Sequence, residues 1–166
     1  YLTRSGAQPG DRLCVSGTLG DAAAGLAVLS GRLAVDESAA AFLAARYIRP
    51  AARLALGQAL RDCATACIDI SDGLLSDAAH IASASGVRLE IDSALLPLSE
   101  TLRSSADLDQ SLDWALAGGD DFELLFTIPD NMPLPDGCME MGRVVAGSGI
   151  SCDLTPERIG YDHFRR

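Results

Sequence analysis

The chain has no lysine and few aromatic residues. All 13 basic residues are scattered arginines, and 23 acidic residues give a formal net charge of −10. A surface that neutralises nucleic-acid phosphates needs clustered basic residues, so this composition argues against a nucleic-acid partner. A phosphate group bound by so acidic a chain would need a metal ion between itself and the carboxylates.

Long apolar runs are also missing. No stretch reaches the ~20 apolar residues of a membrane-spanning helix, and no signal-peptide pattern opens the chain, so we expect a cytoplasmic protein. With 166 residues, 48% apolar and 22% charged, the chain is long enough for one globular domain with a substantial core. It begins at Tyr1 without a methionine, and we interpret 1–166 as a single domain whose upstream part is missing.

Potential zinc ligands are few and poorly spaced. Cys63 and Cys67 lie four positions apart, but no second pair matches them, and His80 and His163 are distant in sequence. This spacing favours buried or free thiols in a reducing cytoplasm over a zinc site.

Strand and helix patterns alternate along the chain. Strands are predicted at 13–16, 65–70, 87–92 and 121–128, and helices at 22–29, 37–48, 51–64, 72–86 and 108–119, with a strand or hairpin at 138–149. Residues 87–92 alternate strictly between apolar and polar, which is typical of a strand with one solvated face. We therefore predict an α+β fold, in which helices pack on a mixed β-sheet.

The stretch "IDISDGLLSD" at 68–77 places Asp69 and Asp72 where a strand gives way to a helix. Ser71 or Asp72 could cap that helix, but capping does not explain Asp69, because burying an unpaired charge in an apolar strand is costly. The two acids could instead share Mg²⁺, and the Ser71 hydroxyl could contact a phosphate. The residues alone leave both interpretations open. Asp77 is assigned to a solvated helix face.

Three further stretches carry potential binding groups. "GGDDFELLF" contains Asp120, Asp121 and Glu123, and its simplest interpretation is a solvated loop followed by a strand with one outward glutamate. The glycines of "SGTLGD" could line an anion site with backbone N–H groups or serve the geometry of a turn. "GYDHF" contributes Tyr161 and His163.

Taken together, six motifs resemble thiamine-monophosphate kinases, in the same order. They are "LTRSGAQPGD", "VSGTLGDAAAGL", "RYIRP", "CIDISDGLLSD", "GGDDFELLF" and "GYDHF". Over essentially all 166 residues the chain looks like the C-terminal domain of this family, which belongs to the aminoimidazole ribonucleotide synthetase superfamily. The resemblance implies that the γ-phosphoryl group of ATP is transferred to thiamine monophosphate, giving thiamine diphosphate and ADP with the help of Mg²⁺.

The resemblance also implies roles for individual residues. Asp69 and Asp72 match magnesium ligands, and Ser71 matches a nucleotide contact. The remaining matches are Arg4 with a nucleotide contact and Glu123 and Tyr161 with substrate contacts. No catalytic base is implied, since a phosphate acceptor is already a good nucleophile and positioning and metal supply the catalysis.

What the chain lacks relative to the family is an N-terminal domain, which carries most of the metal-binding aspartates and the core of a homodimer. The fragment alone is therefore expected to be inactive. Two alternatives stay open. One is another ATP-dependent synthetase of the same superfamily, and the other is a stand-alone module that binds a phosphorylated ligand.

Overall fold

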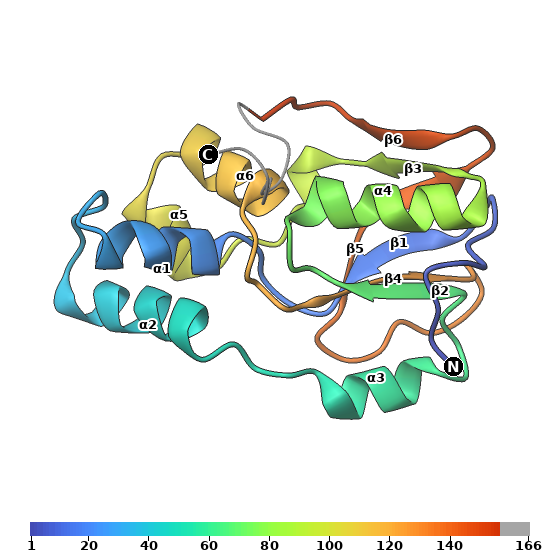
Figure 1. Ribbon diagram of the computed structural model, residues 1–166, viewed down its shortest axis with the longest axis horizontal. Helices are drawn as coiled ribbons and strands as arrows, with labels where there is room; N and C mark the ends of the chain where they lie inside the picture. Colours follow the sequence, from blue (N-terminus) through green and yellow to red (C-terminus); the bar gives the residue numbers. More distant parts are fainter. Residues whose placement is uncertain (157–166) are drawn as a thin grey trace.

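The computed structural model describes residues 1–156, so the predictions for Tyr161 and His163 lie outside the described residues. A six-stranded sheet runs through the molecule in the order β2-β4-β1-β5-β3-β6 (Figure 1). Its strands are β1 (Arg12–Val15), β2 (Ala66–Asp69), β3 (Arg88–Ile91), β4 (Leu124–Ile128), β5 (Met139–Val145) and β6 (Gly149–Cys152). The β3–β6 pair is parallel and the other pairs are antiparallel, which confirms the predicted mixed sheet.

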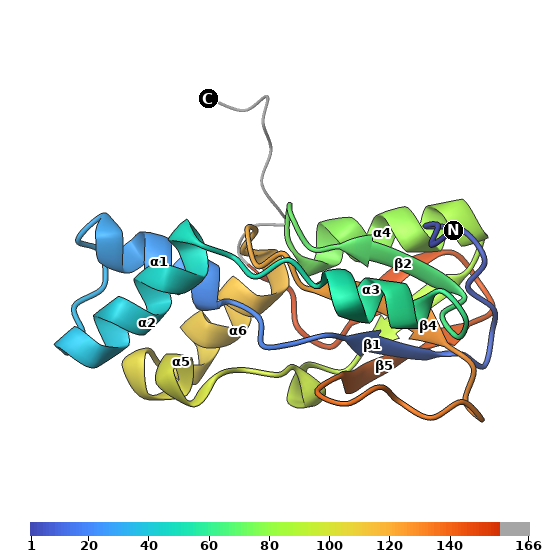
Figure 2. The same ribbon diagram turned by 90° about the horizontal axis from the view of Figure 1, so that it is seen from below.

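The helices form two groups. Four of them gather beside one end of the sheet: α1 (Asp21–Leu29), α2 (Glu37–Ile48), α5 (Glu100–Ser105) and α6 (Leu108–Ala117). Two lie along the sheet itself, namely α3 (Leu54–Leu60) and α4 (Leu74–Ser85), and a 3₁₀ turn, η1 (Ser93–Leu95), follows β3 (Figures 1 and 2). Within residues 1–156, no helix has the length and apolar character needed to cross a membrane.

Local sequence signals account for several of these elements. Helix α2 spans the predicted residues, and the carboxylate of Asp36 accepts a hydrogen bond from the Ala39 N–H, as a capping side chain does. Gly86 ends α4 in the left-handed conformation that glycine favours. The predicted helix over 51–64 is shorter in the structure, because α3 covers only Leu54–Leu60.

Both faces of the central strands are buried. In β1, Leu13 and Val15 join the large core beneath α4, whereas Cys14 points to a smaller cluster that includes Leu60 of α3 and Phe126 of β4. Strand β3 keeps one solvated face, with Leu89 and Ile91 buried and Arg88 and Glu90 exposed, as its alternation predicts.

The smaller core is rich in cysteine. Cys14, Cys67 and Cys138 are buried in it, Cys63 packs against it, and all are free thiols. Burial raises the pKa of both Cys14 and Cys67 to about 12, so these side chains stay protonated at neutral pH. Among residues 1–156, no cluster of three or more His, Cys, Asp or Glu side chains is arranged to hold a metal ion. The predicted buried or free thiols are thus present in the described structure.

Candidate functional site

Two motifs that are far apart in the sequence are joined by backbone hydrogen bonds. The N–H of Ile70 donates to the carbonyl of Glu123 (2.8 Å), and the N–H of Phe122 donates back to Ile70 (2.9 Å). The Asp120 N–H donates to Ser71 (3.0 Å). Gly119 permits this approach, because a Cβ atom there would lie 2.3 Å from the Ser71 carbonyl oxygen. The stretches 69–72 and 119–123 therefore form one unit, which we call the paired loops.

The backbone of the second loop is strained. Asp120 and Phe122 have positive φ angles of 65° and 50°, a region that non-glycine residues rarely occupy and that is costly for a bulky side chain. Asp121 and Glu123 are buried, with only 2% and 1% of their surface exposed. The expected solvated loop with an outward glutamate is wrong, because both acids point into the protein.

The first loop presents its acids differently from what the sequence predicts. Asp69 is the last residue of β2 and is exposed, so it is not a buried charge. Neither Ser71 nor Asp72 caps α4, because Gly73 occupies the N-cap position without a side-chain hydrogen bond. Those predictions are wrong because α4 begins at Leu74, two residues later than the predicted start at 72.

The loop is instead held from inside α4. Asp77, which the sequence places on a solvated face, is 2% exposed and accepts hydrogen bonds from the N–H groups of Ser71 (2.9 Å) and Asp72 (3.0 Å). Burial raises the pKa of Asp77, and the two hydrogen bonds partly oppose that rise. Asp77 thus shapes the loop that carries Asp69 and Asp72.

Asp69 and Asp72 have the donor chemistry that Mg²⁺ requires, since this ion takes oxygen ligands and keeps several waters. They are two carboxylates, however, and no third acidic, cysteine or histidine side chain completes a metal cluster with them within residues 1–156. A magnesium ion held here would need further oxygens from waters, from phosphate groups or from another part of the protein.

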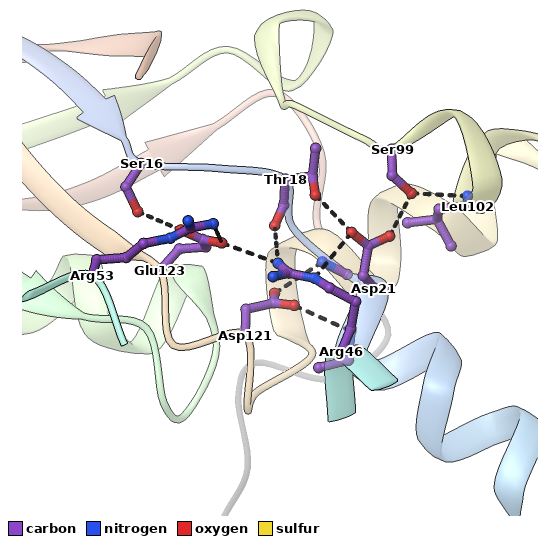
Figure 3. Close-up of polar contacts among 11 residues, drawn as sticks. Ser16, Thr18, Asp21, Arg46, Arg53, Ser99, Leu102, Asp121 and Glu123 are labelled. Atoms are coloured by element: carbon purple, nitrogen blue, oxygen red, sulfur yellow. Dashed lines mark hydrogen bonds and ion pairs between the residues drawn. The ribbon is translucent and has the colours of Figure 1, made fainter. Parts of the chain in front are cut away.

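Glu123 lies at the centre of a buried polar network (Figure 3). Its Oε1 accepts hydrogen bonds from Nη2 of Arg46 (3.0 Å) and Nη2 of Arg53 (2.6 Å). Its Oε2 accepts from Nε of Arg53 (2.7 Å) and from the hydroxyl of Ser16 (2.5 Å). Burial by itself would raise the pKa of Glu123, but the hydrogen bonds from Arg53, Ser16 and Arg46 outweigh it and leave the pKa lowered.

The glycine-rich turn "SGTLGD" serves this network. A Cβ atom on Gly17 would lie 2.6 Å from the carboxyl carbon of Glu123, so only glycine leaves room for that side chain. The N–H groups of Gly20 (2.9 Å) and Ala22 (3.3 Å), at the start of α1, both donate to Asp121. Of the two interpretations left open for this turn, the structure shows N–H groups that bind a carboxyl group of the chain itself.

A second buried acid, Asp21, completes the network (Figure 3). It accepts hydrogen bonds from the hydroxyls of Thr18 (2.6 Å) and Ser99 (2.5 Å), and Nε of Arg46 lies 3.5 Å from its Oδ2. Sequence reasoning missed Arg46, Arg53, Ser16 and Asp21, although "RYIRP" and "SGTLGD" contain three of them. No local spacing signals these contacts, because Arg53 is 70 positions from Glu123.

The structure groups the predicted site residues only in part. Asp69, Ser71 and Asp72 share one loop, and Glu123 is joined to it through Ile70. Arg4 is exposed, and its carbonyl accepts a hydrogen bond from Ser85 at the far end of α4. At 1.5 Å per residue, the backbone of Arg4 lies roughly 17 Å from the loop before α4. Arg4 and Ser71 are thus not brought together within this chain.

The mixed sheet, the covering helices and the paired loops define a domain class that sequence comparison identifies. The chain belongs to the family described as AIR synthase related protein, C-terminal domain, which matches residues 8–150. It is 45% identical over 179 aligned residues to the thiamine-monophosphate kinase of Escherichia coli strain K12. That alignment covers 98% of this chain and 55% of the relative, so the chain spans about half the length of the relatives it matches.

Solved structures agree with this assignment. The structure described as "AaThiL complexed with AMPPCP and TMP" superposes with a TM-score of 0.91 at 40% identity, covering 99% of this chain and 54% of that one. The thiamine-monophosphate kinase from Stenotrophomonas maltophilia K279a gives a TM-score of 0.85 at 40% identity, with 92% and 52% covered. The resemblance seen in the six motifs and the predicted fold class are both confirmed.

Proposed function

We propose that this chain is the C-terminal domain of a magnesium-dependent thiamine-monophosphate kinase that acts in the cytoplasm as a homodimer. An N-terminal domain outside this chain would supply the remaining metal ligands and the dimer core. The similarity to kinases over 98% of the chain supports this proposal, as does the likeness to a structure that holds AMPPCP and TMP.

The observation that carries the proposal is the geometry of the paired loops. The exposed Asp69 lies on the same short loop as Ser71 and Asp72, and backbone hydrogen bonds hold that loop to the strained segment 119–123. Such an incomplete set of oxygen donors suits Mg²⁺ that is also bound by phosphate groups and by a second domain.

Each residue then has a defined task. Asp69 and Asp72 would hold Mg²⁺, and the hydroxyl of Ser71 would contact the nucleotide. Bound Mg²⁺ would supply charge neutralisation for the phosphoryl oxygens. The buried network around Glu123 and the hydrogen bonds that Ser71 and Asp72 donate to Asp77 would keep the loops in place, so that the two phosphate groups meet in alignment. The predicted contacts of Arg4 and Tyr161 stay predictions.

The test uses the full gene product that contains this chain. Wild-type protein should form thiamine diphosphate and ADP from ATP and thiamine monophosphate in the presence of Mg²⁺. Asp69→Asn and Asp72→Asn should each lower turnover by about a hundredfold or more while the fold is retained, because they weaken metal binding. The exposed residue Asp62 offers a charge-matched control, and Asp62→Asn should leave turnover unchanged.

Two results would count against the proposal. Unchanged turnover in both aspartate variants would refute their role as metal ligands. A wild-type protein that forms no thiamine diphosphate, but consumes ATP with a carbonyl or amide substrate, would favour a related synthetase. Tight calorimetric binding of thiamine monophosphate and Mg²⁺ by residues 1–166 alone would favour a stand-alone binding module, whereas half of a shared site should bind weakly.

A further inference from the structure

We propose that Arg53 contacts a phosphate group of a substrate, and that Glu123 is a positioning residue that aims Arg53 rather than a direct substrate contact. This inference rests on the proposed function and deepens it, because it assigns the anion contact of the same site to an arginine that the motifs do not single out.

The carboxylate of Glu123 has no capacity left for a ligand. An ionised carboxylate offers about four lone-pair positions. Four hydrogen bonds already reach it, two from Arg53 and one each from Arg46 and Ser16, and the residue is 1% exposed. A substrate that bound Glu123 directly would have to displace a charged partner from a buried site, which is strongly unfavourable.

Arg53, in contrast, has donors to spare. Its Nε and Nη2 bond to Glu123, while its Nη1 has no hydrogen-bond acceptor within residues 1–156, and 34% of its side chain is exposed. A guanidinium group carries five N–H donors in a planar fork that matches two phosphate oxygens. The bidentate bond to Glu123 fixes the plane of that fork before any ligand arrives, so little entropy is lost on binding.

The other arginine on Glu123 cannot take this role. The side chain of Arg46 is 16% exposed, and its Nη2 is shared between Glu123 and the carbonyl of Thr18. Its Nε is buried and faces Asp21 at 3.5 Å. Figure 3 shows that the two arginines approach Glu123 from opposite sides. Arg46 therefore bonds only to groups inside the described part of the protein, whereas part of the Arg53 side chain is open to solvent.

Arg53 is also linked to the paired loops, where we propose that a phosphate group binds. Its partner Glu123 bonds through its backbone to Ile70, in the loop that carries Asp69 and Asp72. If Asp69 and Asp72 hold Mg²⁺ as proposed, a phosphoryl group bound there would receive positive charge both from the metal and from Arg53, and such charge stabilises phosphoryl transfer. A chain with a net charge of −10 offers few basic side chains that could bind a phosphate group in its place.

The test measures binding to the full gene product by calorimetry, with thiamine monophosphate, AMPPCP and inorganic pyrophosphate as three separate probes. R53Q should lower the affinity for pyrophosphate and for one of the two substrate probes by about 10- to 100-fold, which is the loss expected for a charge-assisted hydrogen bond. The substrate probe that loses affinity identifies whose phosphate Arg53 contacts. R53K, which keeps the charge without the planar fork, should recover affinity only in part.

Arg49 offers a matched control, since it is an exposed arginine in the same connection between α2 and α3. R49Q should bind all three probes within about twofold of wild type. A double-mutant cycle tests the positioning role of Glu123. E123Q should lower the affinity for the same probes in the wild-type background, but it should cause no further loss of affinity in the R53Q background. Thermal unfolding of each variant shows that the protein is folded during the titration.

Several outcomes would overturn the inference. The proposed phosphate contact of Arg53 would be refuted if R53Q bound all three probes as tightly as wild type. It would also be refuted if the wild-type protein bound no pyrophosphate. If E123Q lowers the affinity for thiamine monophosphate by the same factor in the R53Q background as in the wild-type background, Glu123 contacts the substrate itself. The proposed kinase function fails separately, through absence of thiamine diphosphate formation in wild type, while the pyrophosphate comparison still decides the role of Arg53.

Discussion

The backbone N–H of Gly20 donates a 2.9 Å hydrogen bond to the carboxylate of Asp121, across 101 positions of the sequence. This contact fills the N-terminus of α1 with a carboxyl group of the chain itself, at a place where a glycine-rich turn can attract a phosphate group. The two N–H groups at this turn, those of Gly20 and Ala22, are therefore used within the fold, which is consistent with our proposal that phosphate groups bind at the paired loops and at Arg53 instead.

The buried Asp121 makes stability depend on pH. Burial raises its pKa from the ordinary aspartate value to about 7, against the opposing hydrogen bonds from Gly20 and Ala22 and the charge of Arg46. In the unfolded chain the same group loses its proton near pH 4. Deprotonation between these pH values favours the unfolded state, so the contribution of Asp121 to stability should fall as pH rises from 4 to 7, by at most about 4 kcal/mol.

Asp121→Asn removes this titration and keeps the shape and the acceptor oxygen. Urea unfolding of wild type and variant across pH 4–8 should show that the stability of Asp121→Asn relative to wild type rises steadily with pH. Asp62→Asn, on the surface, is the control and should follow the wild-type curve. Parallel curves for wild type and Asp121→Asn would mean that Asp121 is ionised throughout.

Removing the charge of Glu123 should be costly for the fold. Glu123→Gln leaves Arg46, whose side chain is 16% exposed, without its closest charged partner, and breaking a buried ion pair destabilises by roughly 3 kcal/mol or more. Chemical denaturation of residues 1–166 measures this loss. Glu90→Gln changes the same chemical group on the solvated face of β3 and should stay within about 0.5 kcal/mol of wild type. Equal stabilities of the two variants would contradict a buried, structural ion pair.

The contact between the paired loops depends on Gly119. In Gly119→Ala the new Cβ would lie 2.3 Å from the Ser71 carbonyl oxygen, so the loops must separate, at an expected loss of about 2 kcal/mol. Gly57 in α3 is the matched control, since its Cβ would meet only Leu124 Cδ1 at an ordinary 3.7 Å. Gly57→Ala should stabilise the protein by about 0.5–1 kcal/mol. Differential scanning fluorimetry should rank the two variants on opposite sides of wild type.

Asp77 should control the loop that carries Asp69 and Asp72. Asp77→Ala leaves the N–H groups of Ser71 and Asp72 without their buried acceptor, which should lower stability by about 1–3 kcal/mol. It should also weaken Mg²⁺ binding in the full gene product, as measured by calorimetry. Ser83→Ala, at an exposed position of the same helix, should change neither quantity. Wild-type Mg²⁺ affinity in Asp77→Ala would show that the loop keeps its shape without this side chain.

Prediction from sequence succeeded where the signal is local. The limits of α2 and the alternation of β3 both follow from spacings within a few residues. The same local logic failed for Asp77, which it placed on a solvated face, and for Asp72, which it considered a cap. The short-range pattern shows that polar groups follow β2, but it cannot show which acid satisfies which backbone N–H.

The sequence by itself determined the class of fold, the family and the loop with Asp69, Ser71 and Asp72, because apolar periodicity and motif order are written along the chain. Only the tertiary structure decided that Asp69 is exposed and that Glu123 is buried beneath Arg46 and Arg53. The burial of a charged side chain depends on partners supplied from distant segments. For Glu123 those partners come from the turn after β1, from α2 and from the connection before α3, which the sheet topology brings to one place.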